Sequence, residues 1–93
     1  MPSGGNHRRN RRSPHQLERE ELGLLIKLLR VKAGLSQQVL ANRVGREHSY
    51  LSRIESADQI IDVIDLVMLI RAAGGNPRKL LNHLMDELEK EET

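Results

Sequence analysis

Polar side chains that can form hydrogen bonds are concentrated in one short segment, between residues 48 and 53. They supply one imidazole, three hydroxyl groups and one guanidinium: His48, Ser49, Tyr50, Ser52 and Arg53. Four of them, at positions 48, 49, 52 and 53, share one face of a helix, because neighbours on a helix face are three or four residues apart. Such a face, if exposed, is suited to the base edges and phosphates of a DNA major groove.

The same segment does not provide a catalytic arrangement. Ser49 and Ser52 lie close to His48 in the sequence. However, neighbours on one helix do not make a set of nucleophile, base and orienting group, and no device for binding an oxyanion accompanies them. We therefore expect that the protein is not an enzyme.

Metal binding is not expected either. The chain has no cysteine, which excludes a disulfide framework, a thiolate metal site and a cysteine nucleophile, and which fits a reducing cytosol. No two histidines stand at ligand spacing on one helix face, and no cluster of acidic residues joins them. The four histidines are His7, His15, His48 and His83. The sequence thus predicts no metal ion and no cofactor.

Charge is distributed unevenly along the 93 residues, although the net charge is only +2. Residues 1–16 contain no acidic residue and four arginines, which are Arg8, Arg9, Arg11 and Arg12. Residues 86–93 hold five acidic residues against a single lysine. Such blocks are usually solvated. The arginine cluster is either a solubilising tail or an arm that binds a polyanion, and we expect residues 1–15 to form a flexible arm.

Helical periodicity begins after this arm and continues almost to the end of the chain. Leu22, Leu25, Ile26 and Leu29 are spaced as one helix face. Glycines and capping residues then divide the chain, with Ser36, Asp62 and Asn76 as N-caps. We expect an all-α domain over residues 16–90, an acidic tail at 91–93, and five helices. The expected helices cover residues 17–33, 37–44, 47–56, 63–73 and 77–90.

Three of the expected helices carry notable apolar faces. The helix after Asp62 is apolar almost all round, which predicts that it forms the buried centre. The last helix has a long apolar face made of Leu81, Leu84, Met85 and Leu88. The first helix carries a second stripe, Leu24, Leu28 and Val31. This stripe either packs under the last helix, which we favour slightly, or faces a partner.

The segment from Gln37 to Ile54 has the pattern of a helix-turn-helix motif. Two short helices are joined by a turn of three or four residues that contains Gly45. Ala41 is small where the two helices must approach closely. Leu51 and Ile54 tie the second helix to the core. The opposite face of that helix, with the polar residues described above, is left free.

These residues resemble a known family. The run from Gly34 to Gln37, the pair Leu40-Ala41, Gly45 and the run from Tyr50 to Glu55 are similar to the lambda-repressor-like, Cro-type helix-turn-helix family, also called the XRE family. The resemblance covers roughly residues 22–81. It implies a five-helix domain that binds operator DNA, usually as a dimer, and regulates transcription.

The resemblance also implies roles for individual residues. Gln37 corresponds to a glutamine that contacts a phosphate, while His48, Ser49 and Arg53 fall where the family reads bases. Arg30 and Glu55 fall where the family has a structural ion pair. The full set expected at DNA is Gln37, Arg46, His48, Ser49, Tyr50, Ser52 and Arg53, with Arg8, Arg9, Arg11 and Arg12 of the arm.

The sequence departs from the family pattern in two places. Ala57, Asp58 and Gln59 stand where the family usually has a glycine followed by a basic residue. Glu47 stands where the family prefers a small N-capping residue. Glu47 and Asp58 both place negative charge near the expected phosphate path, which weakens nonspecific attraction to DNA.

We therefore expect a regulator of transcription that occupies an operator through the major groove. It would act on double-stranded DNA in the cytoplasm, at the nucleoid, with no membrane partner, because no apolar run is long enough to span a bilayer. We expect a homodimer with contacts through Leu84, Met85 and Leu88, or through the stripe on the first helix. The alternative is a protein-interaction module, such as an antitoxin or co-regulator, that uses the same fold as a scaffold.

Overall fold

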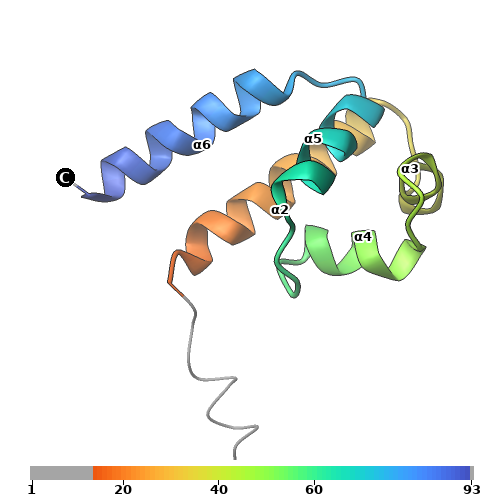
Figure 1. Ribbon diagram of the computed structural model, residues 1–93, viewed down its shortest axis with the longest axis horizontal. Helices are drawn as coiled ribbons and strands as arrows, with labels where there is room; N and C mark the ends of the chain where they lie inside the picture. Colours follow the sequence, from red (N-terminus) through yellow and green to blue (C-terminus); the bar gives the residue numbers. More distant parts are fainter. Residues whose placement is uncertain (1–13, 93) are drawn as a thin grey trace, which may run out of the picture.

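The computed structural model describes residues 14–92, and this part of the chain folds into five helices without a strand (Figure 1). The helices are α2 (Gln16–Lys32), α3 (Gln37–Arg43), α4 (His48–Glu55), α5 (Val63–Ala72) and α6 (Pro77–Glu92). The expected all-α, five-helix class is confirmed, and each helix begins and ends within about three residues of its expected bounds. The arginines of the basic arm, at positions 8, 9, 11 and 12, lie outside the described residues.

Local hydrogen bonds at the expected caps set where three helices begin. The Ser36 hydroxyl accepts the backbone N–H of Val39 at 3.1 Å at the start of α3. Asp62 accepts the N–H of Asp65 at 2.8 Å at the start of α5. The side chain of Asn76 accepts the backbone N–H groups of Arg78 and Lys79 at the start of α6. Pro77, the first residue of this helix, has no N–H and therefore leaves no donor unpaired. Each cap satisfies a donor that the helix itself leaves unpaired.

The core lies where α2, α3, α4 and α5 meet. Its largest fully buried side chains are Ile26, Leu40, Leu51, Leu69 and Ile70, each at most 2 % exposed. Leucine, isoleucine and alanine make up this buried core, and Tyr50 packs against it as a partly buried aromatic residue. Burying such side chains is the main free-energy gain of folding.

Helix α5 is not the buried centre that its composition predicts. Its inner side, formed by Leu66, Leu69 and Ile70, is buried. Its outer side is open, since Val63 and Ile64 are 66 % and 71 % exposed. Helix α5 contacts α2, α3 and α6, which cover one side only.

The second apolar stripe of α2 is also exposed. Leu24, Leu28 and Val31 are 52–56 % exposed, so the favoured expectation that they pack under the last helix is wrong. Helix α6 instead contacts the neighbouring stripe, where Leu25 and Leu29 line a groove together with residues of α6. Leu28 reaches the edge of that groove without being covered.

Helix α6 runs along α2 on the far side of the molecule from α4 (Figure 1). Leu80 is its buried anchor, a residue absent from the expected apolar face. Leu84 and Leu88 are half-buried beside Leu22, whereas Met85 is 56 % exposed. The helix continues through Glu92, past the expected end of the domain. In the described part of the chain, no helix combines the length and the apolarity that crossing a bilayer requires.

Candidate nucleic-acid interface

Helices α3 and α4 pack against each other across the tight turn that links them. Leu40 and Ala41 of α3 and Leu51 of α4 are fully buried, and Ile54 is 3 % exposed. Gly45 adopts φ +72° in the turn, a left-handed conformation that suits glycine. Four buried apolar side chains therefore fix the angle between the two helices, as the sequence pattern predicts.

This packing leaves the polar face of α4 open to solvent. His48, Ser49, Ser52 and Arg53 are all exposed, as expected for residues on the side opposite Leu51 and Ile54. Tyr50 is half-buried and lies closer to α5. The structure thus brings four of the expected residues onto one accessible helix face.

A close approach of two backbones holds α4 against α2. A Cβ atom at Gly23 would lie 2.6 Å from the carbonyl oxygen of Glu55 and 2.7 Å from that of Ile54. Only glycine fits at this distance, because both neighbours are backbone atoms. Sequence reasoning missed this residue, although a lone glycine inside a helical pattern often marks such a contact.

Arg30 and Glu55 form a bidentate ion pair between α2 and the end of α4. The Nε and Nη2 atoms of Arg30 donate to the two carboxylate oxygens of Glu55 at 2.7 and 3.0 Å. The third donor, Nη1, bonds the carbonyl oxygen of Leu35 at 2.9 Å. The two side chains are only 11 % and 4 % exposed. Hydrogen bonding to Glu55 raises the pKa of Arg30, which stays charged.

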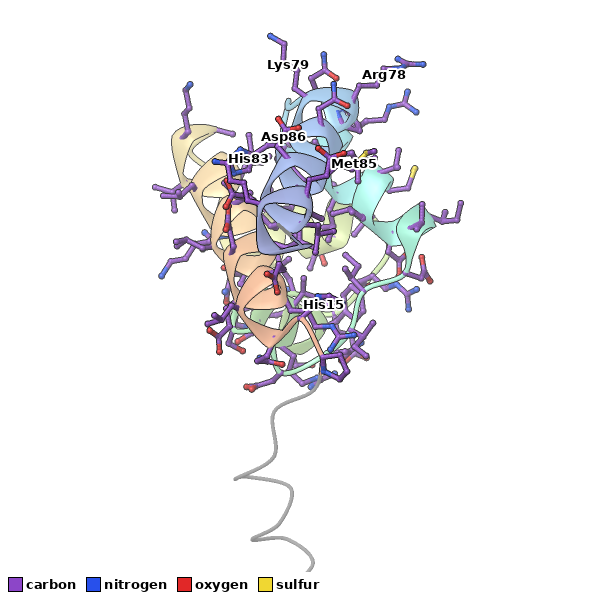
Figure 2. All side chains as sticks on the ribbon, turned by 90° about the vertical axis from the view of Figure 1, so that its left-hand side faces the viewer. His15, Arg78, Lys79, His83, Met85 and Asp86 are labelled. Atoms are coloured by element: carbon purple, nitrogen blue, oxygen red, sulfur yellow. The ribbon has the colours of Figure 1, made fainter. Side chains whose placement is uncertain are left out.

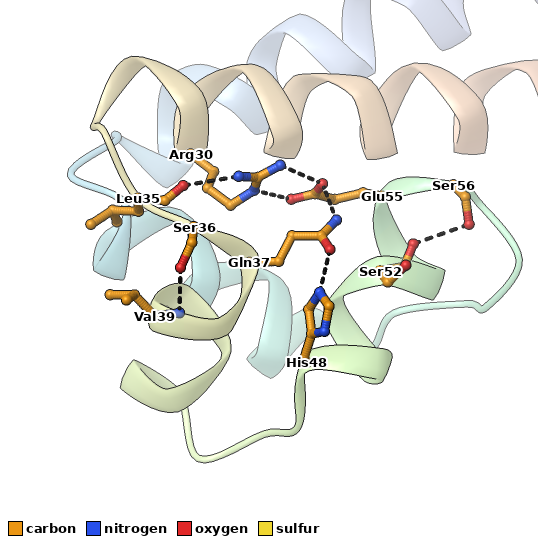
Figure 3. A network of polar contacts seen from close by, with 9 residues as sticks. All are labelled: Arg30, Leu35, Ser36, Gln37, Val39, His48, Ser52, Glu55 and Ser56. Carbon is orange, nitrogen blue, oxygen red and sulfur yellow. Dashed lines mark hydrogen bonds and ion pairs between the residues drawn. The ribbon is translucent and has the colours of Figure 1, made fainter.

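The ion pair extends through Gln37 to the exposed face of α4 (Figure 3). The amide Nε2 of Gln37 donates to Glu55 at 2.8 Å, and its Oε1 lies 2.6 Å from Nε2 of His48. The carboxylate can only accept, so the amide must turn its oxygen toward His48, and His48 must donate from Nε2. A neutral His48 ring therefore presents Nδ1 as an acceptor.

Arg46 and Tyr50 are bound to α5 instead of projecting freely. Asp65 receives a 2.7 Å bond from the Arg46 guanidinium and a second 2.7 Å bond from the Tyr50 hydroxyl. The guanidinium also lies over the Tyr50 ring, 4.7 Å from its centroid. Burial and the bond to Asp65 raise the pKa of Tyr50 to about 12. Asp65 thus joins the turn and α4 to α5, in addition to lying in the first turn of α5.

Arg53 is oriented by a residue that sequence reasoning did not assign to the site. Its Nε donates to Oε1 of Gln59 at 2.9 Å. Arg46, Ser49, Arg53 and Gln59 line one shallow surface depression beside α4. Gln59 lies in the loop after α4, and nothing in the spacing of the sequence indicates this contact.

The loop after α4 begins with a strained residue. Ala57 adopts φ +63°, which is unfavourable for a residue with a Cβ atom. This is the position at which the sequence departs from the glycine of the family pattern. Asp58 follows, and it accepts a bond from the Ser56 hydroxyl at 3.0 Å.

The expectation that no cluster of acidic residues joins a histidine is wrong for His83. Within residues 14–92, Glu21, His83 and Glu87 form one group whose potential ligand atoms all lie within 4.8 Å of one another. Glu21 comes from α2 and the other two from α6, so the group depends on packing that spacing alone does not reveal. It lies away from the exposed face of α4.

The two short helices, the tight turn and the exposed second helix together define a helix-turn-helix domain. The sequence model of a family described as "Helix-turn-helix domain" matches residues 21–84. The chain therefore belongs to the helix-turn-helix family, of the XRE type that the sequence resembles. A comparison with curated proteins gives no match.

Two solved structures share this fold. An XRE-family like protein from Pseudomonas syringae pv. tomato is 34 % identical, with a TM-score of 0.73; the alignment covers 78 % of this chain and 89 % of that one. The restriction-modification controller protein C.AhdI from Aeromonas hydrophila is 28 % identical, with a TM-score of 0.68. Its alignment covers 73 % of this chain and 99 % of the controller.

Proposed function

We propose that this protein is a transcriptional regulator that binds an operator by placing the outer face of α4 in the major groove. The observation that carries this proposal is the exposed polar face of α4, held rigidly by the buried contacts with α3. Membership of the XRE-type family supports it, as does the similarity to a restriction-modification controller. The proposed function is binding alone and includes no catalytic activity.

Base contacts would come from the exposed residues of α4. Arg53 suits a bidentate contact with guanine, and Ser49 and Ser52 can donate or accept at base edges. His48 can accept through Nδ1 while Nε2 stays bonded to Gln37. Gln37 keeps one amide hydrogen beyond its bond to Glu55. That hydrogen is available to a phosphate, the contact that the family resemblance implies.

Other polar and charged groups would change the affinity for DNA without contacting the bases. Arg46 and Tyr50 border the interface but are already bonded to Asp65, so we assign them to its edge. Glu47 is exposed beside α4 and opposes phosphate binding. The arm with Arg8, Arg9, Arg11 and Arg12 would offset this by neutralising phosphates. Because duplex DNA is the proposed target of the protein, we propose that it acts in the cytoplasm.

The working unit that we propose is a homodimer. Of the contacts expected on α6, Leu84 and Leu88 are half-buried within the monomer and only Met85 is exposed. A larger apolar surface, the α5 patch, is formed by Ile60, Val63, Ile64 and Met68, which are 47–71 % exposed. The patch begins in the loop that leaves α4. A dimer through it would relate the two copies of α4 by a two-fold axis, as the two half-sites of a symmetric operator require.

The exposed acidic and apolar side chains favour a second candidate function. Glu47 on the rim of α4, with the α5 patch nearby, would suit a protein partner better than a phosphate backbone. The fold would then serve as an interaction module, such as an antitoxin or co-regulator. This alternative needs no sequence-specific DNA binding.

Selection of bound duplexes from a random oligonucleotide library distinguishes the two functions. The regulator predicts one enriched sequence motif, with two related halves if the dimer forms. The control is a variant carrying Ser49→Ala and Arg53→Ala, because both positions are exposed and the fold should persist. This variant should enrich no motif or a different one. Recovery of no motif by the parent protein would contradict the regulator and leave the interaction module.

A further inference from the structure

The contact between α2 and α6 carries a group of side chains that DNA binding does not use. Glu21 projects from α2, and His83 and Glu87 project from α6. His83 lies on the side of α6 that faces α2 (Figure 2). The three side chains offer one imidazole nitrogen and two carboxylate oxygens, which are ligand atoms for a divalent metal ion.

The two helices place these ligands before any ion binds. His83 and Glu87 are four residues apart, so they lie on one face of α6. Nε2 of His83 lies 2.8 Å from Oε2 of Glu21. Apolar packing fixes the spacing of the two helices nearby, where Leu80 of α6 is buried in the core and Leu25 and Leu29 of α2 pack against that core. The ligand side chains are therefore carried by backbone that is already held in place.

The distances within the group suit a small ion. Ligand atoms at about 2.0–2.2 Å in a tetrahedral zinc site are roughly 3.3–3.6 Å from one another. The corresponding atoms here are all within 4.8 Å of one another. Rotation of the side chains is enough to close this difference. The His83, Glu21 and Glu87 side chains are 49 %, 34 % and 30 % exposed, so an ion can enter from solvent.

The charges of the group also favour a cation. Two carboxylates share the small space, and the Nζ atom of Lys90 lies 3.4 Å from the Glu87 carboxylate. A divalent ion between the carboxylates would neutralise both charges. An imidazole ligand favours a transition metal over magnesium or calcium, which prefer all-oxygen sites with more ligands.

We propose that Glu21, His83 and Glu87 bind one zinc ion, with water completing the coordination. The ion would clamp the middle of α6 onto α2. Because α6 contacts the rest of the chain through α2 and α5, the clamp would stabilise the folded domain. The proposal does not rest on DNA binding and can fail or hold independently of it.

Zinc titration of the full chain tests this site. The zinc affinity is measured in competition with a chromophoric chelator, and thermal unfolding is followed by circular dichroism with and without zinc chloride. We expect one zinc ion per chain and a higher Tm with zinc. His83→Gln and Glu87→Gln should each weaken binding at least about tenfold and abolish the rise in Tm.

The matched control is His15→Gln. His15 is another exposed histidine near a carboxylate, with Nδ1 3.9 Å from Glu18, but among residues 14–92 it belongs to no group of three potential metal ligands. This variant should bind zinc as tightly as the parent. The proposal is overturned if the parent binds no zinc at micromolar concentration, if His83→Gln binds as tightly as the parent, or if one ion is bound per two chains.

Discussion

The ion pair between Arg30 and Glu55 shows how far individual residues could be predicted. The family resemblance implies the pair, and the structure places the two side chains in bidentate contact. The continuation to Gln37 and His48 was not predicted, because it depends on the direction in which each side chain points. Spacing along a helix gives the face on which a residue lies, but not its partner on another helix.

We predict that Arg30 and Glu55 are energetically coupled. Arg30→Met or Glu55→Gln leaves the other side chain without its partner in a nearly buried position, which costs roughly 3 kcal/mol. The double variant should cost less than the sum of the two, with a coupling energy of at least about 1 kcal/mol. Urea unfolding of the four proteins measures it. Strict additivity would mean that the contact contributes nothing.

At position 57, the glycine of the family pattern should make the folded protein more stable than Ala57 does. Ala57 occupies the left-handed region at φ +63°, which costs a residue with a Cβ atom about 1–2 kcal/mol. We predict that Ala57→Gly raises the free energy of unfolding by roughly 0.5–1 kcal/mol, after allowance for the extra freedom of glycine in the unfolded chain. The control is Ala33→Gly, at φ −78°, which should destabilise. A destabilised Ala57→Gly variant would contradict the account of this turn.

At the scale of the helices, the sequence predicts well which helices form and in what order. It predicts poorly which faces of each helix are buried by other helices. Caps at Ser36, Asp62 and Asn76 mark helix starts because each makes a local hydrogen bond. Whether a helix is covered on both sides depends on where distant helices cross it. That is why α5 is exposed on one side and why α6 leaves the second stripe of α2 open.

The placement of α4 depends on one glycine in α2. We predict that Gly23→Ala lowers the free energy of unfolding by about 1–3 kcal/mol, because the new methyl group overlaps the carbonyl oxygens of Ile54 and Glu55. The higher helix propensity of alanine offsets only part of this loss. Lys27→Ala, at an exposed position of the same helix, should stay within about 0.5 kcal/mol of the parent in urea unfolding. Equal stability of both variants would show that α2 and α4 are not in close contact.

At the scale of the whole molecule, the apolar surfaces decide how two copies can associate. We predict that Ile64→Glu combined with Met68→Glu gives a folded monomer, because both side chains are exposed in the α5 patch. Met85→Glu, at an exposed site on α6, should leave the dimer intact. Sedimentation at micromolar concentration measures both. Dissociation by Met85→Glu alone would instead assign the interface to α6, as the sequence first suggests.

The contribution of Arg53 to DNA recognition is the most direct test of the central claim that α4 reads the operator. On the selected duplex, measured by fluorescence anisotropy at fixed salt, Arg53→Ala should weaken binding about 5- to 150-fold, the equivalent of a lost base contact. On unrelated duplexes it should have a much smaller effect. Arg78→Ala removes an exposed arginine from α6 (Figure 2) and should change neither affinity. Unchanged binding of the operator by Arg53→Ala would contradict the placement of α4 in the groove.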